Sequence, residues 1–260
     1  PTTEEVLRLL DIGEPLFPQV RQYRILRAFA GTRPLYTPGG AAGRKASRNF
    51  HIVDHADEGL EGMVSIFGGK LTTYRLMAER VVDRVCAKLG HSAVCRTATE
   101  ALVPDADEAV LKRASRFFPM QGLNLMADRL GDDLPAVLEL AEKQAGNPLI
   151  CECEMVSLAE IEYVARQPAT FSLTDIRLRT RLGMGTCQGA FCSLRTVGAL
   201  AEHDVQLELT PTDNVRRFLQ ERWGGLRFAL WGMQAREMEL SRAIYAATLN
   251  LDGAAHEQDC

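Results

Sequence analysis

The chain has 260 residues, of which 46% are hydrophobic and 25% are charged, and its formal net charge is -4. This composition is that of a globular protein with one large or two modest cores, and its dispersed basic residues make nucleic acid an unfavourable partner. No apolar run approaches the roughly 18 to 20 residues that cross a bilayer, and no charged and then apolar leader opens the chain, so we expect a soluble, cytoplasmic protein.

The first hundred residues predict a few strands and two helices. Thr2-Thr3-Glu4-Glu5 has the form of a capping box and predicts a helix through Leu10. Residues 25–36 predict a strand that runs into a loop, and residues 50–54 and 63–67 predict two further strands. The helix after the last strand should end near Gly90, and we expect its apolar residues to lie on a covered inner face: Leu76, Met77, Val81, Val82, Val85 and Leu89.

The junction between that strand and that helix carries a glycine pair, Gly68-Gly69, followed by Lys70, Leu71 and Thr72. Backbone N–H groups without side-chain cover, at the positive end of a helix, can approach a flat or anionic ligand closely. A tight turn without a ligand is the alternative interpretation, and it is the one that the glycine pair alone favours.

The rest of the chain predicts helices. Residues 105–144 have helical signals interrupted at Pro119, Gly122 and Gly131. Two capping boxes, one proline at a first helical position and the apolar spacing then predict helices at about 158–166, 173–182, up to 203, 211–223 and 233–249. Methionine and aromatic residues along the last of these helices predict core packing, with a docking face for partner subunits as the alternative.

Four of the seven cysteines form two close pairs, Cys151 with Cys153 and Cys187 with Cys192, separated by 33 residues. In a chain without signs of secretion this pattern predicts four thiolates that converge on a metal, rather than disulfides. Because Cys-x-Cys falls outside the usual spacing of zinc knuckles, an iron–sulfur cluster is favoured over structural zinc and over uncoordinated buried cysteines. The remaining cysteines stand apart: Cys86, Cys95 and Cys260.

Basic residues flank this cysteine module. A cluster held by four thiolates carries net negative charge, and nearby guanidinium groups could moderate that charge and adjust the reduction potential. A solvated arginine face is an equally simple explanation for any one of them. The residues concerned are Arg177, Arg179, Arg181 and Arg195.

The cysteine module, with its second pair inside residues 180–192, resembles the 2Fe-2S domain of bacterioferritin-associated ferredoxins in the form appended to flavin-dependent dehydrogenases. Residues 27–35 (Arg-Ala-Phe-Ala-Gly-Thr-Arg-Pro-Leu) and 67–75 (Phe-Gly-Gly-Lys-Leu-Thr-Thr-Tyr-Arg) resemble two motifs of FAD-dependent glycerol-3-phosphate dehydrogenases. Both together are similar to the large subunit of the bacterial anaerobic glycerol-3-phosphate dehydrogenases, over nearly the whole chain. That family opens with a Gly-x-Gly-x-x-Gly segment that is missing here, so we expect the chain to be the C-terminal part of a longer subunit that binds FAD poorly and is inactive alone.

The resemblance implies an α+β fold. We expect the C-terminal portion of an FAD and substrate domain at residues 1–100, a helical spacer at 101–146, the 2Fe-2S helical module at 147–205, and C-terminal helices with a tail at 206–260. Within the first of these regions, the resemblance places Arg33, Arg48 and Lys70 at the substrate, and Gly68, Gly69, Lys70, Leu71 and Thr72 beside the flavin.

The implied reaction is hydride transfer from C2 of sn-glycerol 3-phosphate to FAD, giving dihydroxyacetone phosphate, followed by electron relay through a 2Fe-2S cluster on Cys151, Cys153, Cys187 and Cys192. The implied partners are other subunits of a respiratory complex, one of them linked to membrane quinone, which places the chain peripherally at the cytoplasmic face of the inner membrane. Two alternatives stay open: a structural zinc or cluster-binding helical module, and the 2Fe-2S part of an amine- or amino-acid-oxidising flavoprotein.

Overall fold

The computed structural model of the chain describes residues 1–32, 49–101, 106–144 and 146–250. The chain divides into two compact units, one made of residues 1–29 and 103–260 and the other of residues 30–102. We call the first the helical unit and the second the hairpin unit. Helices dominate, and the described strands form two two-stranded antiparallel sheets, which is consistent with the predicted α+β class.

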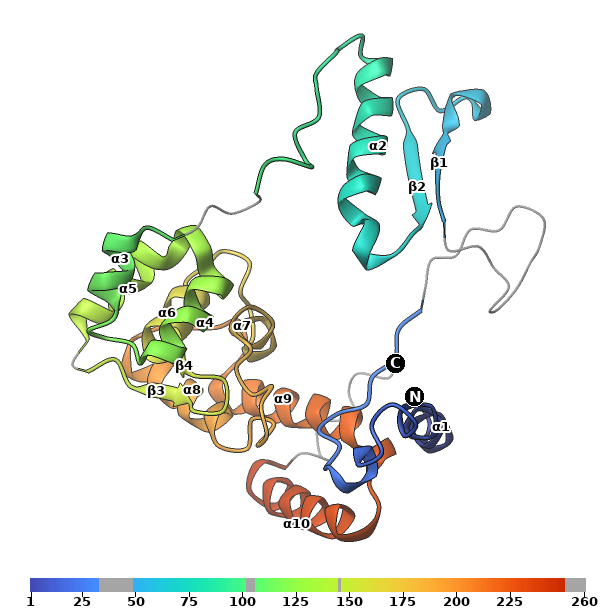
Figure 1. Cartoon of the computed structure of the whole chain (residues 1–260). Helices are drawn as coiled ribbons and strands as arrows, with labels where there is room; N and C mark the ends of the chain where they lie inside the picture. The colour runs from blue at the N-terminus through green and yellow to red at the C-terminus, as the bar shows by residue number, and fades with distance from the viewer. Residues whose placement is uncertain (33–48, 102–105, 145, 251–260) are drawn as a thin grey trace. The chain divides into compact units, whose positions relative to one another are not determined.

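The hairpin unit contains a β-hairpin and one long helix (Figure 1). Strand β1 (Phe50–Asp54) pairs antiparallel with β2 (Val64–Gly68), and the connection carries the short 3-10 helix η3 (His55–Glu58). Both predicted strands are confirmed, the second one residue later than expected. A 3-10 turn, η4 (Leu71–Thr73), then leads into α2 (Tyr74–Lys88), which packs against β2.

The hairpin unit has no closed core in its described part. None of its described residues is buried, and the apolar face predicted for α2 is open: Leu76 is 42% exposed and Val82 is 55% exposed. The helix itself is predicted correctly, whereas the expectation that this face is covered is wrong for the described residues. Polar contacts tie the unit together at the surface, as between Lys88 and Asp54, 2.6 Å apart.

The expectation of a strand at residues 25–36 is wrong for its described part, because residues 25–32 form no regular secondary structure. Their backbone groups bond to helix ends and side chains instead of a neighbouring strand. The Ala28 N–H donates to the carbonyl of Gly225 over 2.6 Å, and the Ile25 carbonyl accepts from the side-chain amide of Gln234 over 2.7 Å. A strand needs a partner edge, and this segment has none among the described residues.

The helical unit begins with α1 (Thr3–Gly13), whose capping box between Thr2 and Glu5 is as predicted, and the 3-10 helix η1 (Val20–Gln22). After residue 106 come α3 (Glu108–Ala114), α4 (Met120–Leu130), η5 (Gly131–Asp133) and α5 (Leu134–Lys143). Gly122 lies inside α4, so the expected interruption at this residue is wrong. The first core of the unit joins these helices to α6 through buried side chains that include Phe118, Leu123, Met126, Leu134, Val137 and Leu138.

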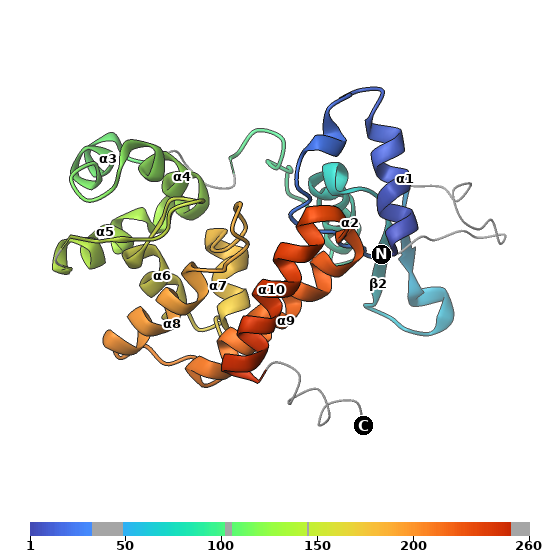
Figure 2. The same cartoon turned by 90° about the horizontal axis from the view of Figure 1, so that it is seen from below.

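A second core lies beneath the cysteines. It is built from β3 (Leu149–Cys151), β4 (Val156–Ser157), α6 (Leu158–Ala165), α7 (Leu173–Thr180), α8 (Cys192–Glu202) and α9 (Pro211–Leu226). The four helices are as predicted, α6 and α7 from their serine capping boxes, but the β3–β4 hairpin was not. After η6 (Arg227–Ala229), α10 (Gly232–Leu249) packs along α9, as both views show (Figures 1 and 2).

In the described ranges, no helix combines the length and the apolar character that a membrane crossing requires.

Candidate functional site

Two loops of the helical unit bring the four clustered cysteines together. Cys151 ends β3 and Cys153 lies in the β3–β4 turn, whereas Cys187 precedes α8 and Cys192 is its first residue. The thiols meet across the two loops, Cys192 hydrogen-bonding to Cys151 and Cys153 to Cys187. Each contact therefore joins one cysteine of the first sequence pair to one of the second.

The site has a buried side and an exposed side. Cys151 and Cys192 are each only 1% exposed, whereas Cys187 is half-buried and Cys153 is exposed. All four are free thiols, as are Cys86 and Cys95, and Cys260 lies outside the described residues.

The environment of the buried pair favours negative charge on one sulfur. The pKa of Cys151 is lowered to about 6, first because the Cys192 thiol donates to it, with the backbone N–H groups of Gly183 and Glu154 acting the same way against the effect of burial. The pKa of Cys192 is raised because it donates that hydrogen bond, because it is buried and because it faces the charges of Cys151 and Cys187. Backbone donors aimed at sulfur are what a thiolate-ligated group requires.

The second cysteine loop owes its shape to residues that tolerate a left-handed backbone. Gly183 and Gly189 have φ of 71° and 83°, and the space that a side chain would need at each is filled by the ring of Phe218 from α9. Between them Gln188 has φ of 51°, and its buried side-chain amide donates to the carbonyls of Met184 and Gly185 over 2.8 and 3.0 Å. Phe218 and Gln188 thus hold the loop from beneath.

Gly185 determines how closely the two loops approach each other. A Cβ at this position would overlap the Cβ of Cys153 and lie 3.3 Å from a carboxylate oxygen of Glu154. The backbone of the second loop therefore packs directly against the first cysteine pair, and only glycine leaves room for this.

The four arginines singled out in the sequence differ in their surroundings. Arg181 bonds to Glu154 over 2.8 Å and Arg195 pairs with Glu152, and both arginines are about half exposed. Arg179 donates to the Thr170 hydroxyl. Arg177 differs from these three because it is buried.

Metal-ligand geometry for a single ion is not preformed in the part of the chain that the structure describes. There, no three His, Cys, Asp or Glu side chains are arranged around a common ion position. A tetrahedral zinc ion requires four sulfurs about 2.3 Å from one point. The cysteines instead form two contacting pairs.

The flavin-side residues lie in the hairpin unit or outside the described residues. Arg33 and Arg48 belong to the latter group. Lys70 is exposed at the start of η4, where its N–H donates to the Thr73 hydroxyl over 3.1 Å, and Leu71 and Thr72 form the exposed first turn.

The glycine pair before Lys70 has φ of 80° at both residues. Side chains there would collide with the Asn49 carbonyl at Gly68 and with the Met77 sulfur at Gly69. Packing within the unit is therefore enough to require glycine, which is the tight-turn interpretation.

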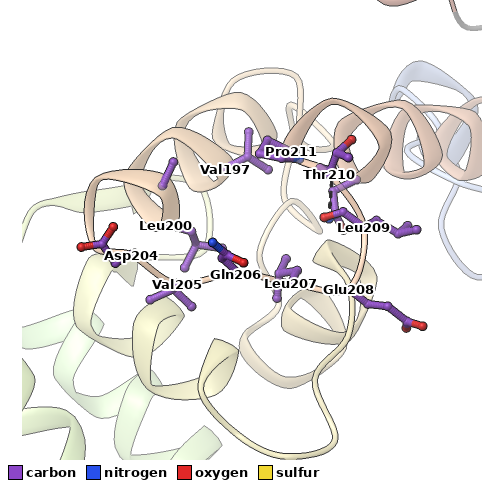
Figure 3. A pocket seen from close by; sticks show the side chains of 12 residues that line it. Val197, Leu200, Asp204, Val205, Gln206, Leu207, Glu208, Leu209, Thr210 and Pro211 are labelled. Carbon is purple, nitrogen blue, oxygen red and sulfur yellow. Dashed lines mark hydrogen bonds between the residues drawn. The ribbon is translucent and has the colours of Figure 1, made fainter.

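A hollow lies elsewhere in the helical unit, between the end of α8 and the start of α9 (Figure 3). It measures about 440 Å³, and the carboxylates of Asp204 and Glu208 point away from it. The side chain of Asn214, which also lines the hollow, accepts a hydrogen bond from the Leu173 N–H and donates one to the Leu209 carbonyl, each over 2.9 Å. We find no reactive group directed into this hollow.

Three contributors to the cysteine site were not foreseen from the sequence. Phe218 supports the second loop, Arg222 lies beside it, and the Tyr245 hydroxyl donates to the carbonyl of Ala190 over 2.6 Å. All three come from α9 and α10, more than 25 residues beyond the last clustered cysteine. No local motif marks such contacts.

Comparison with known proteins gives close relatives, each the A subunit of an anaerobic glycerol-3-phosphate dehydrogenase. The chain is 41% identical over 256 residues to the protein of Escherichia coli K12, covering 96% of this chain and 46% of that protein. It is 41% identical to the A1 subunit of Haloferax volcanii (95% and 42% covered) and 36% identical to the protein of Haemophilus influenzae (96% and 45% covered). No family model and no solved structure matches the chain.

The chain spans a little less than half of the length of these curated relatives, a share that fits the C-terminal part predicted from the motifs. The similarity extends over nearly the whole chain, which includes both the glycine-pair junction and the cysteine module. The chain therefore belongs to the family of the A subunits of anaerobic glycerol-3-phosphate dehydrogenases.

Proposed function

We propose that this chain is the electron-relay part of an FAD-dependent sn-glycerol-3-phosphate dehydrogenase, and that its helical unit binds a 2Fe-2S cluster. The observation that carries the proposal is the convergence of Cys151, Cys153, Cys187 and Cys192 in two contacting pairs. The names of the relatives supply the dehydrogenase, and the cysteines supply the relay.

The residues at the cysteine site fit such a cluster. In a 2Fe-2S cluster each of the two irons is bound by two of the four thiolates. An arrangement of the cysteines in two pairs therefore suits such a cluster better than it suits a single metal ion. Backbone N–H groups of Gly183, Glu154 and Cys187 point to cysteine sulfurs, where they would stabilise thiolate charge. A 2Fe-2S cluster, when bound, takes up and releases single electrons.

The hairpin unit supplies groups for the flavin side. Arg33 and Arg48 would bind the phosphate and the oxygen of the reacting carbon, since a planar guanidinium forms paired hydrogen bonds with such groups. Lys70 and the first turn at Leu71 and Thr72 would place positive charge and N–H donors beside the flavin. FAD, when bound, accepts the hydride from glycerol 3-phosphate.

The partners follow from the same family. The names of the relatives describe one lettered subunit of an assembly, so other subunits should receive the electrons. We propose that one of them passes the electrons to membrane quinone and holds the complex at the cytoplasmic face of the inner membrane. The exposed side of the site, at Cys153, is where an electron would leave the chain.

The test is metal and sulfide analysis of anaerobically prepared protein. We expect about two irons and about two acid-labile sulfides per chain, with a brown absorbance that bleaches on addition of dithionite. Cys187→Ser should lose them, whereas Cys95→Ser, an exposed thiol in the hairpin unit, should keep them. Stoichiometric zinc without sulfide, even after reconstitution with iron and sulfide, would contradict the relay.

A further inference from the structure

Arg177, on α7, is buried, and no carboxylate among the described residues is bonded to it. Its residue is 7% exposed, and its Nε has no hydrogen-bond partner among the described residues. The guanidinium lies 5.5 Å from the centre of the Phe218 ring, the same ring that fills the space over Gly183 and Gly189 in the second cysteine loop. A buried cation with an unused donor calls for a nearby negative charge.

Arg222, on α9, follows Phe218 in the sequence and resembles Arg177 in its surroundings. Its Nε is also buried and has no partner in the described part of the chain, and its Nη2 lies 3.8 Å from the Met238 sulfur. The side chain lines a small cavity together with Thr186 and Gln188, which flank Cys187. Both guanidinium groups therefore adjoin the second cysteine loop.

Within the described ranges, neither arginine forms an ion pair with a carboxylate. Glu221 is the acidic residue that acts on Arg177, but its two oxygens accept from Arg217 over 3.3 Å and from the Thr174 hydroxyl over 2.9 Å. The remaining groups that would carry negative charge near these guanidinium groups, once deprotonated by a bound metal, are the thiols of Cys192 at both arginines and of Cys187 at Arg222, with the Tyr245 hydroxyl also facing Arg222. Burial lowers the pKa of both arginines, and a neighbouring cation, Arg27 at Arg177 and Arg24 at Arg222, acts in the same direction.

We propose that Arg177, which is buried, and Arg222, which is half-buried with a buried Nε, are the counter-charges of the cysteine-held cluster and raise its reduction potential. This inference rests on the proposed function, because it requires a cluster at the four cysteines. One-electron reduction makes the thiolate-bound cluster more negative, so a nearby buried cation stabilises the reduced form more than the oxidised one. The exposed arginines Arg181 and Arg195 are screened by water and engaged by glutamates, and contribute much less.

The measurement is a redox titration of the anaerobically reconstituted chain, with dithionite as the source of one electron per cluster. The reduction is monitored by visible absorbance and by the paramagnetic signal of the reduced cluster. Arg177→Met and Arg222→Met should each lower the equilibrium constant for reduction by about tenfold, a fall of about 59 mV for one electron. Arg177→Lys and Arg222→Lys keep the charge and should restore most of it. Arg181→Met and Arg195→Met are the matched controls, with a change well below tenfold.

A second readout separates charge compensation from a merely structural role. Without a cluster, a buried arginine lacks its counter-charge, so the cluster-free methionine variants should unfold in urea at the same or a higher concentration than the wild type. Methionine variants with a full cluster and an unchanged potential would overturn the proposal. The proposal would also be overturned if the cluster-free methionine variants unfolded at a lower urea concentration than the wild type and the lysine variants were destabilised to the same extent. If the wild type itself holds no iron and sulfide, the proposed function fails instead.

Discussion

At the scale of single residues, the approach of the two cysteine loops depends on the hydrogen atom that Gly185 has in place of a side chain. Its backbone is not left-handed, so alanine would be tolerated there but for the Cβ of Cys153. We expect Gly185→Ala to push the loops apart and to reduce the iron and sulfide bound per chain by more than half, because cluster ligands must be held close to their productive positions.

The matched control is Gly198→Ala, on the same unit. Gly198 lies inside α8 with nothing near the position of an added Cβ, so alanine should keep the cluster and stabilise the helix by roughly 0.5 to 1 kcal/mol. Iron and sulfide assays on the two variants, with thermal unfolding of each, make the comparison. Full cluster content in Gly185→Ala would show that the loops can separate without consequence.

The sequence predicts which residues form this site better than it predicts the surroundings of each residue. Cysteine spacing alone singles out Cys151, Cys153, Cys187 and Cys192, because ligand spacing is a local property. The differences among flanking arginines were not predictable, since Arg177 is buried by Phe218, which lies 41 residues further along the chain. Contacts at such separations have no signature in a single sequence.

At the scale of elements, a buried ion pair and a hydrogen bond from its arginine join α4 to α6 and to the β3–β4 hairpin. Arg129 lies 2.5 Å from Glu160, with side chains 8% and 0% exposed, and also donates to the Glu154 carbonyl beside Cys153. Burial raises the pKa of Glu160, although the charge of Arg129 and the Ser157 bonds oppose this. A raised pKa in the folded state means that stability from this group is present at low pH and is lost as pH rises through that pKa.

We therefore expect Arg129→Met to cost about 3 to 5 kcal/mol of unfolding free energy near neutral pH, because an uncompensated carboxylate remains buried. Without the arginine the pKa of Glu160 rises further, so the cost should shrink as pH is lowered from about 8 to about 5. Urea unfolding across this range measures it. Adding Glu160→Gln should remove the pH dependence of the difference.

The control for this pair is Arg113 with Glu142, 2.7 Å apart but with the arginine 57% exposed. Arg113→Met should cost less than about 1 kcal/mol at every pH, because water already solvates both charges. A cost for Arg129→Met that is equally small, or that does not vary with pH, would mean that Glu160 finds another partner.

Elements were predictable where their signals are local. The capping boxes at Thr2, Ser157 and Ser172 place three helix starts correctly. The β3–β4 hairpin was missed because strands of three and two residues are too short to show alternation. The error at residues 25–32 has the opposite cause: the residues favour an extended backbone, but a strand also requires an edge to pair with.

At the scale of the whole molecule, the two units differ in how their apolar surface is covered. The described part of the helical unit contains three clusters of buried apolar side chains, whereas no described residue of the hairpin unit is buried. A two-stranded hairpin with one helix over it is marginally stable without such a core. The face predicted for α2 is largely exposed, because whether anything covers such a face depends on long-range packing that the sequence does not reveal.

This difference predicts unequal local stability, which amide hydrogen exchange measures directly. Helices α2 and α9 have similar lengths, 15 and 16 residues, but α9 buries five residues, including Phe218 and Leu219, and α2 buries none. We expect amides of α2 to exchange at least about tenfold faster than those of α9, because opening α2 exposes less apolar surface. Equal protection of the two helices would show that the hairpin unit is held closed by packing as extensive as that of the helical unit, and the exposed face of Leu76 and Val82 would then have to be covered in solution.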